Sequence, residues 1–491
     1  MSFYSKFPRD ASSFRIFSDS MLQDSSLPLS DVIDQSVFDE AFELFDVDFS
    51  CDDDAVYTPA LVLWALLSQA LFKDEQRSCN AAVTRIAAWW AAQGRVVDDT
   101  NSGAYCRARQ KISDELVAHL VRTIAQRAEK SSDLAEPLDD EQAEAMLTPR
   151  AIADVKSKPL AGRVLMVDGF TVDAADTPEN QKEYPQNPSQ EEGLGFPLLR
   201  CVSLVSMATG MLVDLAIAPY CGKETGETAL LRQMIDSLGP GDVLVADSYY
   251  CTYWLLAMCQ ARGVEVVMKN HHKRDDHPED AVRICKGQRK VVWPRPQRPT
   301  WMSREEYALM PKQVEVRLVD IKVDEPGFRP EGFTIATTIV DHRVYTDTWI
   351  GSVYQSRWLV ELDIRSIKCS LGMDILRAKT PPMVRTELWS CLLAYNLTRL
   401  KMLQSGIDGS RDVRSMSFTR SMVLLGTSWL LCGARGVNDS LVELGQAQPL
   451  DELVGHREGR IEPRANKRRP KVLKLLTAPR AAYQVQLGSA A

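Results

Sequence analysis

The sequence predicts an α/β core that is interrupted by a mostly β segment and flanked on both sides by helices. Three observations indicate this fold class. Residues 160–270 alternate apolar β-rich runs with helical patterns, residues 271–349 break that alternation, and the segments before and after are helical in pattern. Alternating strands and helices require a sheet with helices packed on it. At 491 residues the chain is long enough for two or three domains.

An acidic segment, residues 1–55, comes first. Between Asp31 and Asp54 it holds ten Asp and Glu and no Lys or Arg. Its short apolar clusters favour one or two short helices. A solvated surface is the simplest interpretation of such a run of charge.

Residues 56–135 are predicted to form an all-α domain. A first helix begins at Pro59 and a second ends at Gly94. A turn then leads to a short basic helix that carries Arg107 and Arg109, and a further helix follows. Successive short helices with a basic one after a Gly-containing turn are typical of helix-turn-helix readers of DNA. A plain helical bundle with a basic surface helix is the equal alternative.

Residues 160–270 are the first part of the core. They run as a strand to Asp168 and Gly169, a hairpin, a helix, a strand that ends at Asp247, a helix and a last strand. Both aspartates follow apolar runs at the carboxyl ends of predicted strands, where α/β sheets place ligands and chemistry. A carboxylate that emerges from a buried element is costly unless it meets a metal ion or another cation. For either aspartate alone, a turn or a helix cap is the alternative.

Three segments complete the chain. They are a mostly β insertion rich in Pro, Arg and Lys (271–349), the second part of the core (350–405) and a helical region with a basic tail (406–491). Further helices are predicted from about Met383 and Met422. The tail from His456 to Arg480 holds nine Lys and Arg against two Glu.

The stretch from Ile350 to Cys369 is predicted to be a single helix, because it is rich in helix-compatible residues and lacks Pro. At about 100° per residue, four polar side chains fall within about 60° of one another: Tyr354, Arg357, Glu361 and Lys368. Arg365 projects to the same side. One carboxylate among cations and a phenol suits a site that binds a metal ion together with a polyanion. An ordinary amphipathic helix with a basic face is the alternative.

Three carboxylates could act together. Asp168, Asp247 and Glu361 would suffice for two divalent ions about 3.5–4 Å apart, which activate a water and stabilise the leaving oxygen of a phosphodiester. Mg²⁺ suits such a site because it prefers oxygen ligands and keeps several waters. Arg357 and Lys368 would then neutralise phosphate oxygens.

Composition and charge exclude few partners. No apolar stretch is long enough to cross a bilayer and the N-terminus lacks the apolar core of a signal peptide, so we expect a cytoplasmic protein without a membrane partner. The 11 cysteines show no zinc-ligand spacing, which indicates reduced thiols. A net charge of −8 argues mildly against nucleic-acid binding, but the charge is unevenly spread and local charge decides such contacts.

The spacing Tyr354-x₂-Arg357-x₃-Glu361-x₆-Lys368 resembles the Y-R-E-K signature of bacterial DDE transposases of the insertion sequence four group. The flanking text TPPMVRTELWSCLLAYNLTR, the run VDGFTVDAADTPEN around Asp168 and the run ADSYY around Asp247 strengthen the resemblance. It extends from about Tyr57 to Arg480.

The resemblance implies an RNase H-like (retroviral integrase-like) catalytic fold, with a β-strand insertion between the second Asp and the Glu. By the same likeness, Asp168, Asp247 and Glu361 are the metal-binding triad, served by two Mg²⁺ ions for which Mn²⁺ can substitute. The residues that would contact DNA phosphates near the cleaved end are Tyr354, Arg357 and Lys368.

The implied activity is metal-dependent cut-and-paste transposition. It comprises strand cleavage at terminal inverted repeats, a hairpin intermediate and strand transfer into target DNA, carried out by a homodimer in a synaptic complex. An aromatic residue of the insertion would stack a flipped base. By position this is Phe333, where the family often has Trp; Trp293 and Trp301 are alternatives, and a core role for Phe333 is equally compatible.

Other functions are weaker. A DNA-binding repressor or domesticated transposase that no longer cuts is the main rival, and the presence of all three acids with Lys368 argues against it. An aspartate-nucleophile phosphatase requires a second Asp at position 170, where this chain has Phe170. Autoinhibition by DNA mimicry is a lesser alternative for the acidic run.

Overall fold

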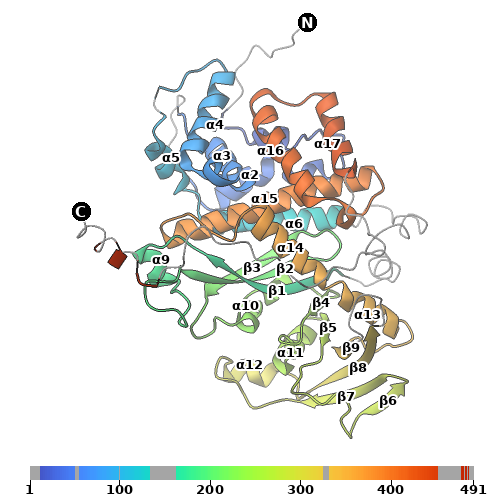
Figure 1. Ribbon diagram of the computed structural model, residues 1–491. Helices are drawn as coiled ribbons and strands as arrows, with labels where there is room; N and C mark the ends of the chain where they lie inside the picture. The colour runs from blue at the N-terminus through green and yellow to red at the C-terminus, as the bar shows by residue number, and fades with distance from the viewer. Residues whose placement is uncertain are drawn as a thin grey trace.

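A mixed β-sheet runs through the computed structural model, which describes residues 11–49, 55–98, 100–132, 162–323, 331–451, 477–479, 482, 483 and 485. In this part of the chain the sheet has nine strands in the order β3-β2-β1-β4-β5-β9-β8-β7-β6 (Figure 1). The strands are β1 (Val164–Asp173), β2 (Leu198–Ser206), β3 (Leu212–Pro219), β4 (Val243–Ala246), β5 (Glu265–Lys269), β6 (Val282–Cys285), β7 (Gln288–Pro294), β8 (Gln313–Val323) and β9 (Glu331–Thr337).

The first five strands form the mixed half of the sheet. β1, β4 and β5 are parallel, and the hairpin β2–β3 lies antiparallel beside β1. Gly210 in the hairpin turn has a φ of 73°, a conformation that side chains other than Gly rarely adopt. The predicted α/β core with an early hairpin is confirmed.

β1 is longer than its predicted end at Gly169. It continues to Asp173 because β2 pairs with it along that whole length, from Leu165 opposite Ser206 to Asp173 opposite Leu198. The prediction that Asp168 ends a strand is therefore wrong. Asp168 lies instead just past the point where the parallel pairing of β1 with β4 ends.

The segment predicted as a mostly β insertion extends the same sheet. β9 pairs antiparallel with β5, and β8, β7 and β6 follow outward in antiparallel order. β6 and β7 form within the Pro-, Arg- and Lys-rich stretch, where no regular alternation marked them. Figure 1 shows these strands at the far end of the molecule from the N-terminal helices.

Helices cover both faces of the sheet. α10 and α11 pack on the face that carries Leu165, Val167 and Leu244, whereas α6, α14 and α15 pack on the face that carries Met166 and Val245. The helices are α1 (Arg15–Ser20), α2 (Gln35–Leu44), α3 (Pro59–Leu71), α4 (Cys79–Ala92), α5 (Ser102–Arg109), α6 (Asp114–Ser132), α9 (Pro178–Glu183), α10 (Glu227–Gln233), α11 (Tyr253–Ala261), α12 (Arg304–Leu309), α13 (Asp347–Gln355), α14 (Trp358–Arg365), α15 (Pro381–Asp408), α16 (Phe418–Arg435) and α17 (Asp439–Asp451). Shorter 3₁₀ turns are η1 (Ser30–Ile33), η2 (Asp74–Arg77), η3 (Ile235–Ser237) and η5 (Val413–Ser415).

The single helix predicted from Ile350 to Cys369 is wrong. The chain forms α13, breaks at Ser356 and Arg357, continues as α14 and ends in a π-helical turn, η4 (Ser366–Ser370). At the break the amides of Arg357 and Leu359 bond to the carbonyls three residues earlier, which tightens the turn. The Ser356 hydroxyl bonds to the Ser352 carbonyl, an arrangement that often bends helices.

The N-terminal and C-terminal helices share one hydrophobic core. α3 packs on α15 and α16, and α4 also packs on α16. Figure 1 shows α15 lying over the sheet and α3, α4 and α16 above α15. The basic tail from His456 to Arg480 lies outside the described residues except for 477–479. No helix in the described part of the chain is both long and apolar enough to span a bilayer.

Candidate active site

Asp168 and Asp247 lie side by side on adjacent parallel strands. Met166 of β1 pairs with Val245 of β4, so continuing that register by two residues places the two aspartates level with each other. Both strands are buried up to this point, since Val167 and Ala246 are fully covered. The carboxylates therefore lie together next to the last paired residues of β1 and β4.

Arg357 links the third carboxylate to the first. Its guanidinium Nη2 lies 2.9 Å from Glu361 Oε1, and Nη1 lies 3.6 Å from Asp168 Oδ2. Arg357 is the N-cap residue of α14 and lies one turn before Glu361. Arg357 thus bridges two members of the predicted triad, Asp168 on β1 and Glu361 on α14.

The environment of Asp168 disfavours its charged form. Burial raises the pKa of Asp168 to about 6, the Gly169 amide and Arg357 oppose the shift, and nearby Asp247 and Glu361 add to it. A carboxylate with this pKa is partly protonated near pH 6, so cation binding here competes with a proton. A bound cation would therefore stabilise the charged form of Asp168.

The raised pKa of Asp168 predicts a stability effect with a definite sign. The native state holds its proton more tightly than the unfolded chain does, so stability falls as the pH rises from about 4 to about 6. Without divalent ions, Asp168→Asn should therefore raise the free energy of unfolding at pH 7.5 by about 2 kcal/mol. Near pH 3.5 the two proteins should be equally stable.

Urea unfolding at the two pH values, with EDTA present, measures this difference. Asp374→Asn is the matched control, because Asp374 is an exposed carboxylate close to the far end of β1. A loss of stability in Asp168→Asn at pH 7.5 would contradict the assigned environment.

Two aromatic rings and a lysine line one side of the site. The ring centroids of Phe333 and Tyr354 are 5.4 Å apart, and Lys269 Nζ lies 5.5 Å from the centre of the Phe333 ring. Tyr354 also contacts Arg357. Lys269 is level with Asp247, because Ala246 of β4 pairs with Met268 of β5. The sequence did not single out Lys269, although it follows an apolar run just as both aspartates do.

The remaining predicted residues divide into near and distant ones. Lys368 Nζ donates to the Thr171 carbonyl at 2.8 Å, three residues beyond Asp168 on β1. Arg107 and Arg109 are on α5 in the helical layer, away from the carboxylates. Arg107 is exposed, whereas Arg109 lines a cavity of about 220 Å³ together with Arg77 and Arg377.

The carboxylates are the type of donor that a divalent cation prefers, although they are not arranged as a complete coordination site. Within the described ranges, no three Asp, Glu, His or Cys side chains lie close enough together to form a metal-binding group. Asp168, Asp247 and Glu361 nevertheless supply only oxygen donors, and both neighbours raise the pKa of Asp168. A hard cation such as Mg²⁺ would relieve that repulsion. The residues fit a divalent ion once Arg357 gives up its carboxylate partners.

Comparison with known proteins assigns the family. Residues 159–397 match the family model described as "Transposase DDE domain". A curated relative, the transposase InsG for insertion sequence element IS4 of Escherichia coli (strain K12), is 26% identical over 329 residues, which are 66% of this chain and 71% of that protein. The chain is thus similar to DDE transposases of the IS4 type. A transposase is a DNA-cleaving and strand-transferring enzyme, and DDE domains generally use divalent metal ions.

Among solved structures, the transposase is similar to the piggyBac transposase in a synaptic complex with hairpin DNA. The two share 11% sequence identity at a TM-score of 0.41, over 89% of this chain and 85% of that one. At this score the likeness is too distant to assign details of fold or chemistry. The matched family segment, residues 159–397, spans the candidate site from Asp168 to Lys368.

Proposed function

We propose that this transposase moves a bacterial insertion sequence by a cut-and-paste route. It would nick one strand at each terminal inverted repeat, use the freed 3′ hydroxyl to form a hairpin on the opposite strand, and later transfer the strand to target DNA. The observation that carries the proposal is the placement of Asp168 beside Asp247 on adjacent strands, with Glu361 joined to Asp168 through Arg357. An RNase H-like core is proposed with it, supported by the hairpin beside three parallel strands.

Asp168, Asp247 and Glu361 would hold two divalent ions, Mg²⁺ with Mn²⁺ as a substitute, which supply an activated water and stabilise the leaving oxygen. The protein's own part is to place these oxygens and the DNA. Arg357 is the residue that must change partners, because it bridges two of the three carboxylates. Once it releases them, its guanidinium is available to a DNA phosphate.

Tyr354, Lys368 and Lys269 would contact the DNA near the cleaved end. Lys269 is added to the predicted set because it lies one strand from Asp247 and next to the Phe333 ring. A cation and a phenol on one side of the carboxylates are suited to a phosphate backbone.

Phe333 is the preferred residue for stacking on a flipped base. It lies beside Tyr354 and is only partly covered. Cations lie closer over the alternative rings: Arg274 is 3.8 Å from the Trp293 ring centre and Arg232 is 3.8 Å from that of Trp301, whereas Lys269 is 5.5 Å from that of Phe333. A base could not stack on those faces without displacing a guanidinium.

The helical N-terminal part would bind the DNA ends. The protein would act as a homodimer in a synaptic complex, in the cytoplasm. Arg107 is the exposed cation of α5. Arg107→Ala should weaken binding of terminal-repeat DNA about three- to ten-fold, and should reduce the slope of log affinity against log salt by about one. Fluorescence anisotropy over a salt series measures both quantities.

Arg15→Ala is the matched control for that change, because the Arg15 side chain is 79% exposed and belongs to the acidic N-terminal segment. An unchanged salt slope in Arg107→Ala would show that α5 is a helix of a plain bundle and does not contact DNA through Arg107.

Incubation of the protein with labelled terminal-repeat DNA tests the proposed activity. In Mg²⁺ or Mn²⁺ we expect a nicked strand first and then a hairpin on denaturing gels, with neither product in EDTA. Binding without any metal-dependent cleavage would support the repressor alternative and overturn the proposal.

A further inference from the structure

A buried carboxylate lies two residues beyond Glu361 on the same helix. Asp363 is fully buried, and it is on the opposite side of α14 from the exposed Glu361 side chain. Burial of an acid requires compensation by cations and hydrogen-bond donors. Sequence reasoning assigned this residue no role.

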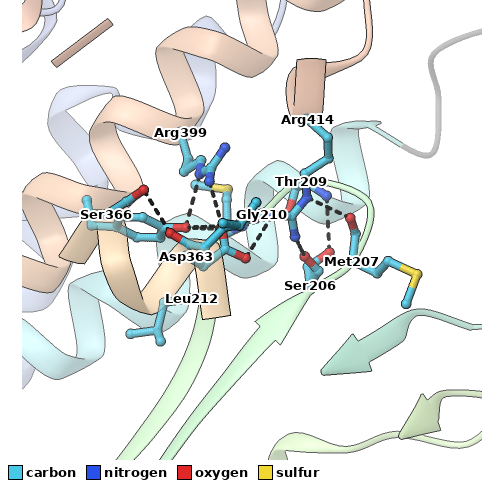
Figure 2. Close-up of polar contacts among 12 residues, drawn as sticks. Ser206, Met207, Thr209, Gly210, Leu212, Asp363, Ser366, Arg399 and Arg414 are labelled. Atoms are coloured by element: carbon cyan, nitrogen blue, oxygen red, sulfur yellow. Dashed lines mark hydrogen bonds and ion pairs between the residues drawn. The ribbon is translucent and has the colours of Figure 1, made fainter. Parts of the chain in front are cut away.

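Two arginines and a tyrosine supply that compensation (Figure 2). Arg414 Nη1 lies 2.8 and 2.7 Å from the two oxygens of Asp363, and Arg399 Nη2 lies 2.5 Å from Oδ1. The Tyr395 hydroxyl lies 3.0 Å from the same Oδ1. Both guanidinium groups are nearly inaccessible to solvent, so the pairs are hardly screened.

The same groups reach the hairpin that flanks β1. Arg414 donates to the carbonyls of Ser206 and Met207 at 2.6 and 2.9 Å. The Tyr395 hydroxyl also lies 2.7 Å from the Gly210 carbonyl, so its single hydrogen is shared between that carbonyl and Asp363. A side chain at position 210 would crowd both guanidiniums, which lie about 3 Å from its Cβ position. The cluster therefore joins α14, α15, η5 and the β2–β3 turn at one point.

α14 has few other anchors. It has only eight residues, begins at the break after α13 and ends in the π-helical turn. Two of its large apolar side chains face outward, with Trp358 46% and Leu362 38% exposed. Its remaining buried side chains are Leu359 and Val360. Apolar contacts are not directional, so they hold the position of the helix along its axis less firmly than hydrogen bonds do.

We propose that Asp363 is a positioning residue, which together with Arg399 and Arg414 sets the place of Glu361 opposite Asp168. The inference rests on the proposed role of Glu361 as a metal-binding carboxylate. Asp168 lies on β1, which pairs with the hairpin strand β2. The cluster therefore fixes the helix that carries Glu361 to the same hairpin that supports Asp168. Loss of the Asp363 charge would loosen α14 and spread the positions that Glu361 can take.

Mn²⁺ binding by calorimetry, without DNA, tests this role in the full chain. Asp363→Asn should weaken the affinity for Mn²⁺ about ten-fold, as expected when a group that orients a metal ligand is lost. Hydrogen exchange should also become faster in α14 than in α15. Strand cleavage should then need about ten-fold more Mn²⁺ for half its maximal rate.

The matched control is Asp242→Asn. Asp242 is another buried acid in an arginine pair, 2.6 Å from Arg163 Nη2, at the opposite end of β4 from Asp247. It should lower the melting temperature to a similar extent and leave both Mn²⁺ affinity and α14 exchange unchanged. If Asp363→Asn does not fold, the same measurements on Arg414→Lys test the proposal. Lysine keeps the charge but loses the forked contacts of the guanidinium with Asp363.

Unchanged Mn²⁺ affinity and unchanged α14 exchange in a folded variant would overturn the positioning role. Failure of the unmutated protein to bind Mn²⁺ would instead overturn the proposed metal site. In that case the exchange of α14 amides still tests whether Asp363 holds this helix.

Discussion

Glu361→Gln is expected to reduce metal-dependent strand cleavage by about a thousand-fold or more, while binding of terminal-repeat DNA stays within about three-fold. Glutamine keeps the size of the side chain but removes the charge with which α14 contributes to the site. Its effect on folding should be small, because the Glu361 side chain is 57% exposed and its pair with Arg357 is open to solvent. Cleavage of end-labelled DNA in Mn²⁺, with binding measured in parallel, separates the two effects.

Asp347→Asn is the matched control for that prediction. Asp347 is an exposed carboxylate in the first turn of the neighbouring helix α13. It should leave cleavage unchanged. Cleavage by Glu361→Gln at the rate of the unmutated protein would show that Glu361 is not a catalytic carboxylate. That result would not depend on the roles of Asp168 and Asp247.

Trp429→Ala should lower the free energy of unfolding by about 3–5 kcal/mol, which is the range for a large aromatic side chain lost from a core. Trp429 is fully buried, stacks on Trp64 with ring centroids 6.4 Å apart and meets Phe17 edge-on at 5.7 Å. Its indole N–H donates to the Trp64 carbonyl at 3.1 Å. One side chain thus joins α16 to α3 and α1.

Urea unfolding followed by circular dichroism measures that loss. Hydrogen exchange should show α3 and α16 losing protection together, because they share this core. Leu431→Ala, on the same helix but 43% exposed, should cost less than about 1 kcal/mol. A small loss in Trp429→Ala, or loss of protection in α16 alone, would show that the two helical parts are energetically separate.

Local sequence was sufficient for much of the fold. Apolar, β-rich runs marked β1 to β5 and the later strands β8 and β9. Capping residues marked α3, which begins at Pro59 as predicted, because the Thr58 side chain accepts a bond from the Leu61 amide. β6 and β7 were missed as separate strands because Pro and charged residues obscure any alternation there.

The site was predictable only in part. Asp168 and Asp247 follow apolar strands, and Glu361 belongs to a spaced motif, so all three could be selected from the sequence. The assumption of one straight helix failed, because backbone bonds at Ser356 and Arg357 depend on how α13 and α14 pack on the sheet. Arg357 contacts Asp168 on β1 as well as Glu361 on its own helix, and the sequence indicated only the second contact.

The sequence by itself determined the three candidate carboxylates and the strands on or next to which two of them lie, because apolar runs and motif spacing are local properties. Only the tertiary structure decided which groups meet. Lys269 beside Phe333, Arg357 between two carboxylates, and Asp363 held by Arg399 and Arg414 all join segments far apart in the chain. Such contacts arise from strand register and helix packing, which no local pattern encodes.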